Sequence, residues 1–187
     1  SRFYGRLVKC AEVIVGVGAN SGFYELVAAV YSDSSQIYAF EPFPPALESL
    51  EANIRLNGFE SRIHVEAKAV ADKPGTAQLY VPEKRFGETL ESSASLNKDF
   101  RPGHDRVIDV PVTTLDQFAR ENGLSRMDIL RIDVESFEHA VLKGAREVLR
   151  NLRPIIAIEI LEAADCATIE AIRAETGYRS FYVAGRD

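Results

Sequence analysis

The sequence predicts a single α/β domain in which a mostly parallel sheet is covered by helices on both faces. Short apolar runs rich in Val and Ile alternate with longer segments whose apolar residues recur every three or four positions. Because most of the short runs are apolar throughout, both faces of the sheet should be buried, as they are in parallel sheets. No repeat or linker divides the chain, so we expect one domain over 1–187.

The apolar runs give the expected strands. The first run ends in glycine, and the second stops at Pro42. Strict alternation near residue 80 is typical of a half-buried strand. The expected strands are 12–18, 36–41, 63–70, 76–81, 107–112, 127–134, 154–161 and 178–183.

Helices are expected between these strands. Pro44 and Pro45 suit a first helical turn, Thr114 suits an N-cap, and Gly58 and Gly177 suit helix ends. The expected helices are 23–30, 44–57, 114–119, 137–149 and 163–176. The remaining long segment, 82–106, has few large apolar residues, so we expect a lid or a substrate-binding loop there.

Composition narrows the classes of partner. The net charge of -6 argues against a nucleic-acid partner, and no apolar run approaches the ~20 residues of a membrane span. Cys10 and Cys166 lie far apart with no metal-ligand spacing, so we expect no metal site, a reducing compartment and a cytoplasmic location. No secretory leader is recognisable. Because the chain begins at Ser1 rather than Met, we expect either a fragment or the ordered part of a longer protein.

A ligand site is expected where the first two strands end. The turn 16–22 carries glycines at 16, 18 and 22, which allow a tight bend and the close approach of a ligand to a helix N-terminus. Glu41, about 20 residues further on, is placed to accept hydrogen bonds from ribose hydroxyls. These features favour an adenosine-containing ligand. The third glycine falls one position late for the dinucleotide fingerprint, although the spacing alone does not separate a dinucleotide from S-adenosylmethionine.

Carboxylates gather after the strand 127–134. Asp133, Glu135 and Glu138 lie within six residues, and Glu159 follows the next strand. Such a group suits a general base, an anchor for a substrate hydroxyl or a weak metal ligand. The alternative is that these acids only favour a helix N-terminus.

Several motifs, taken in order, resemble the FkbM-type methyltransferases, a branch of the class I S-adenosylmethionine-dependent enzymes. The resemblance runs from about Glu12 to Leu161. The segments that carry it are Gly16–Gly22, Tyr38–Pro42, Asn53–Asn57, Ala69–Asp72 with Gly75, Thr114–Asp116, and Ile132–Glu138 with Leu142–Gly144. The resemblance implies a Rossmann-like class I methyltransferase fold, with a reversed strand at one edge of the sheet.

The resemblance also implies which residues bind S-adenosylmethionine. Gly18, Ala19, Asn20 and Gly22 would line the methionine side, Glu41 with Pro42 would hold the ribose, and Val70 and Asp72 would lie near the adenine. Gly16 would begin the cofactor-binding turn, but the family usually carries there an aspartate that helps to hold the methionine end. Ser136 replaces a glycine that is usual in the family. These two departures leave a catalytically impaired binding module open as the alternative.

The expected reaction is transfer of a methyl group to a hydroxyl oxygen of a small molecule, sugar or polyketide. Because a hydroxyl is a poor nucleophile, a general base is needed, with Asp133 as the first candidate, Glu135 the second and His104 a third. A nicotinamide-dependent oxidoreductase is a third class of function, for which the glycine spacing is wrong. The expected contacts to the acceptor are Ser93, Ser95, Asn97, His104, Glu138 and Glu159. The sequence identifies neither the acceptor nor the oligomeric state.

Overall fold

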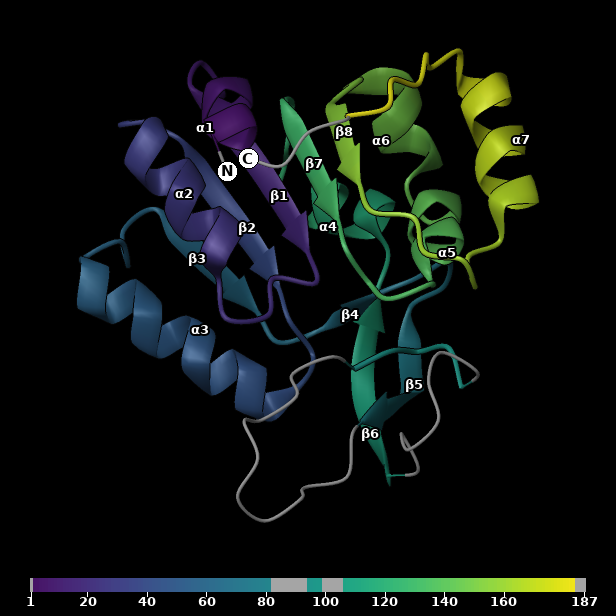
Figure 1. Ribbon diagram of the computed structural model, residues 1–187, viewed down its shortest axis with the longest axis horizontal. Coiled ribbons are helices and arrows are strands. Elements are labelled where there is room, and N and C mark those ends of the chain that lie inside the picture. The colour runs from purple at the N-terminus through teal and green to yellow at the C-terminus, as the bar shows by residue number, and fades with distance from the viewer. Residues whose placement is uncertain (1, 82–93, 99–105, 184–187) are drawn as a thin grey trace.

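A five-stranded sheet forms the centre of the protein. The computed structural model describes residues 2–81, 94–98 and 106–183. Within this part of the chain the five strands are all parallel and lie in the order β3-β2-β1-β7-β8 (Figure 1). They are Val13–Val17 (β1), Gln36–Phe40 (β2), Ile63–Glu66 (β3), Ile129–Ile132 (β7) and Ile155–Ile158 (β8). The predicted α/β class is confirmed, and the reversed edge strand is not among the described strands.

Helices cover both faces of this sheet, because successive side chains of a strand point to opposite faces. Ile14 of β1 packs with α1, α2 and α3, whereas Val15 and Val17 pack with α4, α5, α6 and α7. The first group is Arg2–Val8 (α1), Phe23–Tyr31 (α2) and Pro44–Asn57 (α3). The second is Leu115–Glu121 (α4), Glu138–Lys143 (α5), Arg146–Asn151 (α6) and Cys166–Thr176 (α7). Helix α1 was not predicted from the sequence.

A second, three-stranded sheet lies beyond the carboxyl ends of the central strands (Figure 1). Its strands are Ala69–Val70 (β4), Gly75–Val81 (β5) and Arg106–Thr113 (β6), in the order β4-β6-β5. The prediction of one strand over 63–70 is therefore wrong. The chain turns after β3, where the Lys68 N–H donates to the Glu66 carbonyl (2.8 Å), and β4 then pairs with β6 instead of β2.

The predicted helix 137–149 is two helices, because the chain bends between α5 and α6. The Gly144 carbonyl accepts a hydrogen bond from the Asp116 N–H (2.9 Å), a residue of α4. A Cβ at Gly144 would lie 2.1 Å from the Ala71 carbonyl oxygen, so only glycine allows this approach to the segment after β4. The bend therefore joins the second group of helices to the small sheet.

The predicted last strand, 178–183, is also wrong. The Tyr178 hydroxyl donates to the Pro154 carbonyl (2.9 Å), and the Arg153 guanidinium lies 4.7 Å from the centroid of its ring. Phe181 and Tyr182 are 79% and 92% exposed, so the apolar residues that suggested a strand have no sheet to bury them. The segment leaves β8 at the edge of the central sheet in the described part of the chain.

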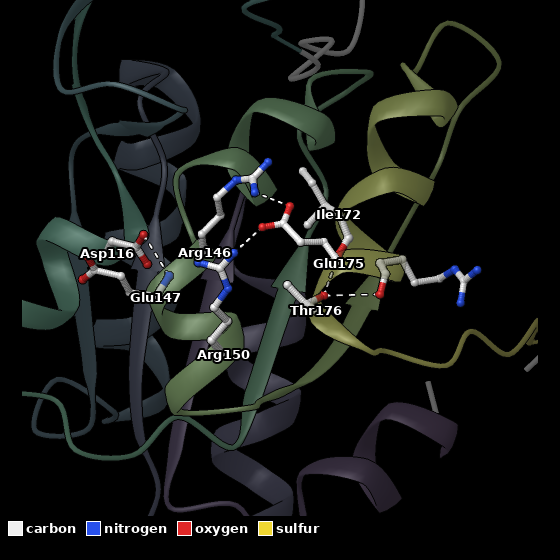
Figure 2. A network of polar contacts seen from close by, with 8 residues as sticks. Asp116, Arg146, Glu147, Arg150, Ile172, Glu175 and Thr176 are labelled. Atoms are coloured by element: carbon white, nitrogen blue, oxygen red, sulfur yellow. Dashed lines mark hydrogen bonds and ion pairs between the residues drawn. The ribbon is translucent and has the colours of Figure 1, made fainter.

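Polar contacts fasten α4, α6 and α7 together on one face of the sheet (Figure 2). Arg146 and Arg150, four residues apart on α6, both form ion pairs with Glu175 of α7. Asp116 of α4 accepts from two backbone amides in the first turn of α6, at 3.1 Å from Glu147 N and 2.9 Å from Val148 N. This carboxylate therefore acts as the N-terminal cap that α6 lacks in its own sequence.

Candidate functional site

The glycine turn after β1 is held against the end of β2. The Gly18 and Ala19 N–H groups both donate to the Phe40 carbonyl (3.0 Å each). Gly18 and Gly22 have φ values of 80° and 87°, and Asn20 has a φ of 52°. These left-handed conformations suit glycine and asparagine, which explains the residue types in the turn.

The same turn touches the end of β7. A Cβ at Gly18 would lie 1.8 Å from the Asp133 carbonyl oxygen. No side chain fits in that space, so glycine at this position lets the ends of β1 and β7 approach each other. Asp133 is thereby brought next to the turn although it lies more than 110 residues further along the chain.

Glu41 connects the glycine turn to the end of β2. Its carboxylate accepts from the Asn20 N–H (2.7 Å) and from the Phe43 N–H (2.9 Å). The residue is 6% exposed, yet it lines the cleft described below. Burial raises the pKa of Glu41 to about 7, against the opposite effect of the two amide hydrogen bonds and with a smaller contribution from the charges of Glu25 and Asp133. The two oxygens of Glu41 are therefore held by the backbone of the glycine turn and of the segment after β2, while the residue borders the cleft.

A cleft opens at the carboxyl ends of the central strands, between them and the small sheet. One wall is polar and is formed by the turns after β1, β2 and β7, and the other is mostly apolar and is formed by the small sheet with residues 94–96. The lining residues are Val17, Gly18, Asn20, Phe40, Glu41, Pro42, Lys68, Ala69, Val70, Leu79, Ala94, Leu96, Asp133, Val134, Glu135 and Phe137. Ligands of open α/β sheets bind at this edge. Of the predicted cofactor residues, Gly18, Asn20, Glu41, Pro42 and Val70 line the cleft.

Asp133 lines the cleft while bound to a buried cation. Its carboxylate forms an ion pair with Arg131, whose side chain is 10% exposed. The Arg131 guanidinium also donates to the Gly18 carbonyl (3.3 Å) and lies 3.9 Å from the centroid of the Tyr24 ring. Arg131 thus connects the glycine turn, α2 and the acid at the end of β7, and it fixes the direction in which that acid points.

The turn after β7 has the conformation that glycine would favour. Glu135 and Ser136 have φ values of 54° and 74°, both in the left-handed region. The Ser136 N–H donates to the Glu138 carboxylate (3.0 Å). Ser136 therefore keeps a glycine-like backbone in place of the usual glycine, and Glu135 still lines the cleft. The strain of two consecutive left-handed residues is stored beside the site.

Other predicted cofactor residues lie outside the cleft lining. Gly16, Ala19 and Gly22 are buried within or beneath the glycine turn. Asp72 is exposed and lines a separate hollow on the small sheet, which shares Leu96 and Phe137 with the cleft.

The predicted acceptor contacts are not brought together in the described part of the chain. The Ser95 hydroxyl donates to the Glu135 carbonyl (2.6 Å) and accepts from the Asn97 N–H (3.0 Å), so its contacts are structural. Glu138 is 1% exposed and binds the turn before α5, with its pKa raised by burial. Glu159 is exposed after β8 and does not line the cleft. Ser93 and His104 lie outside the described residues.

Part of the predicted loop 82–106 does border the cleft. Residues 94–98 are described, and Ser95 forms an isolated antiparallel bridge with Tyr80 of β5. This places Ala94 and Leu96 against the apolar wall. The remainder of the predicted lid lies outside the described residues.

Two charged residues next to the cleft were not predicted from the sequence. Arg131 could have been found from its spacing, because residues two apart on a strand share a face and Asp133 follows it at that distance. Glu25 is 2% exposed and shares the buried stripe of α2 with Ala28 and Ala29. An acid on such a stripe indicates a charge in the interior of the protein.

No group of three or more His, Cys, Asp or Glu side chains in the described part of the chain is arranged to hold a metal ion. No described helix has the length and apolar character needed to cross a membrane.

Comparisons with known proteins show the family to which the chain is similar. The family profile described as "Methyltransferase FkbM domain" matches residues 16–180. "Methyltransferase sdnD" of Sordaria araneosa is 29% identical, over 88% of this chain and 73% of that protein. "31-O-demethyl-FK506 methyltransferase FkbM" of Streptomyces tacrolimicus is 25% identical, over 82% and 67%. "2-O-methyltransferase NoeI" of Sinorhizobium fredii is 26% identical, over 79% and 63%.

A solved structure shares the fold. The FkbM methyltransferase of Methylobacillus flagellatus KT matches with a TM-score of 0.62 and 17% identity, over 89% of this chain. The chain spans 37% of the length of that protein. At this identity the likeness shows the fold, which is that of the class I methyltransferases.

Proposed function

We propose, on the premise that this chain belongs to the FkbM methyltransferase domain family, that it uses S-adenosylmethionine to methylate a hydroxyl oxygen of a small molecule or glycan. The observation that carries the proposal is the position of Glu41. Its carboxylate lines the cleft at the junction of the glycine turn and β2, where acidic side chains of open α/β folds accept hydrogen bonds from ribose hydroxyls.

The residues of the cleft suit the chemical parts of this cofactor. Glu41 offers acceptor oxygens to the ribose, and Val70, Leu79 and Leu96 offer an apolar wall to the flat adenine. Gly18 and Asn20 of the glycine turn line the cleft, so the sulfonium end can lie against this turn. Asp72 is exposed on the separate hollow, so a role for it at the adenine depends on contacts other than those of the cleft.

In this reaction the protein itself does little covalent chemistry. S-adenosylmethionine, when bound, supplies an electrophilic methyl group. The protein must align the acceptor oxygen with that group, exclude water and remove a proton. We assign the proton removal to Asp133, which lines the cleft in a direction fixed by Arg131, with Glu135 as the second candidate on the same turn.

A hydroxyl acceptor is supported by the names of two relatives. One is a 2-O-methyltransferase, and the other acts, by its name, on a 31-O-demethyl compound. Each is 25–26% identical to this chain, so the transfer to oxygen is part of the proposal.

The structure lends no specific support to a non-catalytic binding module. One of the two departures that suggested it, Ser136, keeps the left-handed backbone that a glycine would adopt. The turn after β7 therefore retains its path, and both Asp133 and Glu135 reach the cleft.

Ligand binding provides the first test of the proposed function. Thermal unfolding is measured in the presence of S-adenosylmethionine, S-adenosylhomocysteine or NADH. A ligand that binds the native state raises Tm by mass action. We expect the first two to raise Tm and NADH to leave it unchanged. A rise with NADH alone would replace the proposal by an oxidoreductase.

Methyl transfer is then measured with S-adenosylmethionine labelled in the methyl group and a panel of hydroxylated sugars and polyketides. The expected product is an O-methyl ether identified by mass spectrometry, together with S-adenosylhomocysteine. Binding of the cofactor with transfer only to nitrogen or carbon acceptors would overturn the oxygen assignment and leave the methyltransferase assignment standing.

A further inference from the structure

Glu25 is a buried acid on α2 that has no part in the roles described above. The residue is 2% exposed, and among the described residues its Oε2 atom has no hydrogen-bond partner. A buried carboxylate oxygen without a donor is costly, and such atoms are rare in native proteins. The presence of Glu25 in the interior therefore needs a physical explanation.

Its position shows what the carboxylate replaces. A Cβ at Gly16 would lie 2.1 Å from Glu25 Oε1, so the carboxylate fills the space that a side chain on Gly16 would occupy. Gly16 lies on β1 one residue before the end of the strand, where the glycine turn begins. Glu25 thus places a negative charge directly beside the start of the turn, although it is carried by the following helix.

The charges around Glu25 are not balanced. The nearby cation is Arg131, which already forms an ion pair with Asp133 and donates to the Gly18 carbonyl. Glu25 and Asp133 therefore share one buried guanidinium, and the charges of both acids act unfavourably on Glu41. The phenol of Tyr4 also faces this group and carries no positive charge. A cation that arrived at the turn would be stabilised by this excess of negative charge.

The other acids of the site are less suited to receive such a cation. One Asp133 oxygen is held by Arg131, and both Glu41 oxygens accept backbone N–H groups. Glu138 also keeps an oxygen without a partner in the described part of the chain, but its other oxygen fixes it to the Ser136 N–H of the turn before α5. Glu25 combines an unused oxygen with a place beside the glycine turn.

We propose that the Glu25 carboxylate binds the ammonium of the amino-acid part of S-adenosylmethionine, and so makes Glu25 a cofactor-binding residue of this chain. The assignment rests on the proposed function. It requires no aspartate on β1, because the helix supplies the carboxylate that Gly16 lacks. Glycine at position 16 then leaves the room that Glu25 needs to reach the turn, and it does not impair the site.

The test compares two ligands that differ in the amino-acid part. S-adenosylhomocysteine carries the ammonium, whereas 5′-methylthioadenosine has the adenosine and the sulfur but no ammonium. Both are titrated calorimetrically into the wild type, Glu25→Gln and the control Glu48→Gln, an exposed acid on α3. Far-ultraviolet circular dichroism and Tm establish that each variant is folded.

The assignment predicts a loss that is specific to one ligand. Glu25→Gln should weaken S-adenosylhomocysteine by about 10- to 100-fold, as for a hydrogen bond to a charged group, and leave methylthioadenosine within about twofold. Glu48→Gln should change neither. An equal loss for both ligands, or no loss for either, would overturn the assignment while the proposed function stands. Failure of the wild type to bind S-adenosylhomocysteine would overturn the proposed function and this assignment with it.

A second variant moves the carboxylate from the helix to the strand. Gly16→Asp combined with Glu25→Ser should recover most of the affinity for S-adenosylhomocysteine that Glu25→Gln loses. Gly16→Asp alone should be poorly folded, because its side chain would meet the Glu25 carboxylate. A folded double variant that binds S-adenosylhomocysteine as weakly as Glu25→Gln would count against the assignment.

Discussion

Arg131 and Asp133, two residues apart at the end of β7, form an ion pair beside the cleft. The pair is oriented from both sides, because the same guanidinium donates to the Gly18 carbonyl and lies over the Tyr24 ring. Asp133 therefore reaches the cleft in one direction, fixed by a buried partner. A fixed direction is what a group must have if it removes a proton from an aligned acceptor.

The first prediction concerns Asp133→Asn. If Asp133 is the base, turnover should fall by about 10²-fold or more, while the affinity for S-adenosylhomocysteine stays within a few fold. Turnover is measured with the acceptor found in the transfer assay, and affinity by calorimetry. Glu159→Gln is the control, because this exposed acid follows the next strand without lining the cleft. Full activity of Asp133→Asn would leave Glu135 as the candidate.

The second prediction concerns Glu41→Ala. Loss of its carboxylate should weaken S-adenosylmethionine by about 1–3 kcal/mol, as for a charge-assisted hydrogen bond. Because the ribose is common to all adenosine ligands, methylthioadenosine should be weakened to the same extent, in contrast to Glu25→Gln. Calorimetric titration of both ligands measures the effect, and unchanged affinities would show that Glu41 does not contact the ribose.

The third prediction concerns strain at Ser136. Its φ of 74° is unfavourable for serine, and among the described residues its buried Oγ has no hydrogen-bond partner. Ser136→Gly should raise the free energy of unfolding by about 0.5–1.5 kcal/mol, since relief of the left-handed strain exceeds the entropy that glycine adds to the unfolded chain. Thermal or urea unfolding measures the change.

Ser35 provides the control for this prediction. It is fully buried, and its Oγ is also without a partner in the described part of the chain, but its φ is not positive. Ser35→Gly should therefore lower stability. If both variants were destabilised alike, strain at Ser136 would be negligible.

The fourth prediction concerns pH. Burial raises the pKa of Glu25 from 4.5 to about 6, so the folded protein holds this proton more tightly than the unfolded chain does. The resulting stability is complete below pH 4.5 and is lost as the pH rises through about 6. In the absence of ligand, the stability of Glu25→Gln relative to wild type should therefore increase by about 1–2 kcal/mol between pH 5 and pH 7.

Urea unfolding of both proteins across this range measures the difference, in which the other titrating groups cancel. Glu48→Gln should follow the wild type at every pH. If the difference in free energy of unfolding between Glu25→Gln and wild type did not change with pH, the Glu25 carboxylate would not be destabilised by burial.

The sequence was sufficient for β1, β2, β7 and β8, because each of these strands is a short, mostly apolar run followed by a turn. It failed where a local pattern was broken by a distant contact. Residues 63–70 read as one strand, since nothing in them reveals that Ala69 pairs with Val112. Residues 137–149 read as one helix, since the bend at Gly144 depends on its approach to Ala71.

Part of the cleft could also be predicted from the sequence. Gly18, Asn20 and Glu41 follow strand ends, and the topology brings strand ends together, so their positions could be inferred. Glu25 could not be placed in this way, because its importance depends on the absence of a side chain at Gly16. Asp72, which the resemblance places near the adenine, lines the neighbouring hollow, and its role stays a prediction.

The pairing of β1 with β7 has a consequence for how the protein matures. The backbone of Val13 binds the side chain of Asp128, 115 residues away, and the turn at Gly18 is closed by the carbonyl of Asp133. Pairings of such long range form late and slow folding. During synthesis the nascent chain must therefore keep its first strand unpaired on one side until β7 leaves the ribosome, and a product truncated before that strand would lack the part of the polar wall that follows β7.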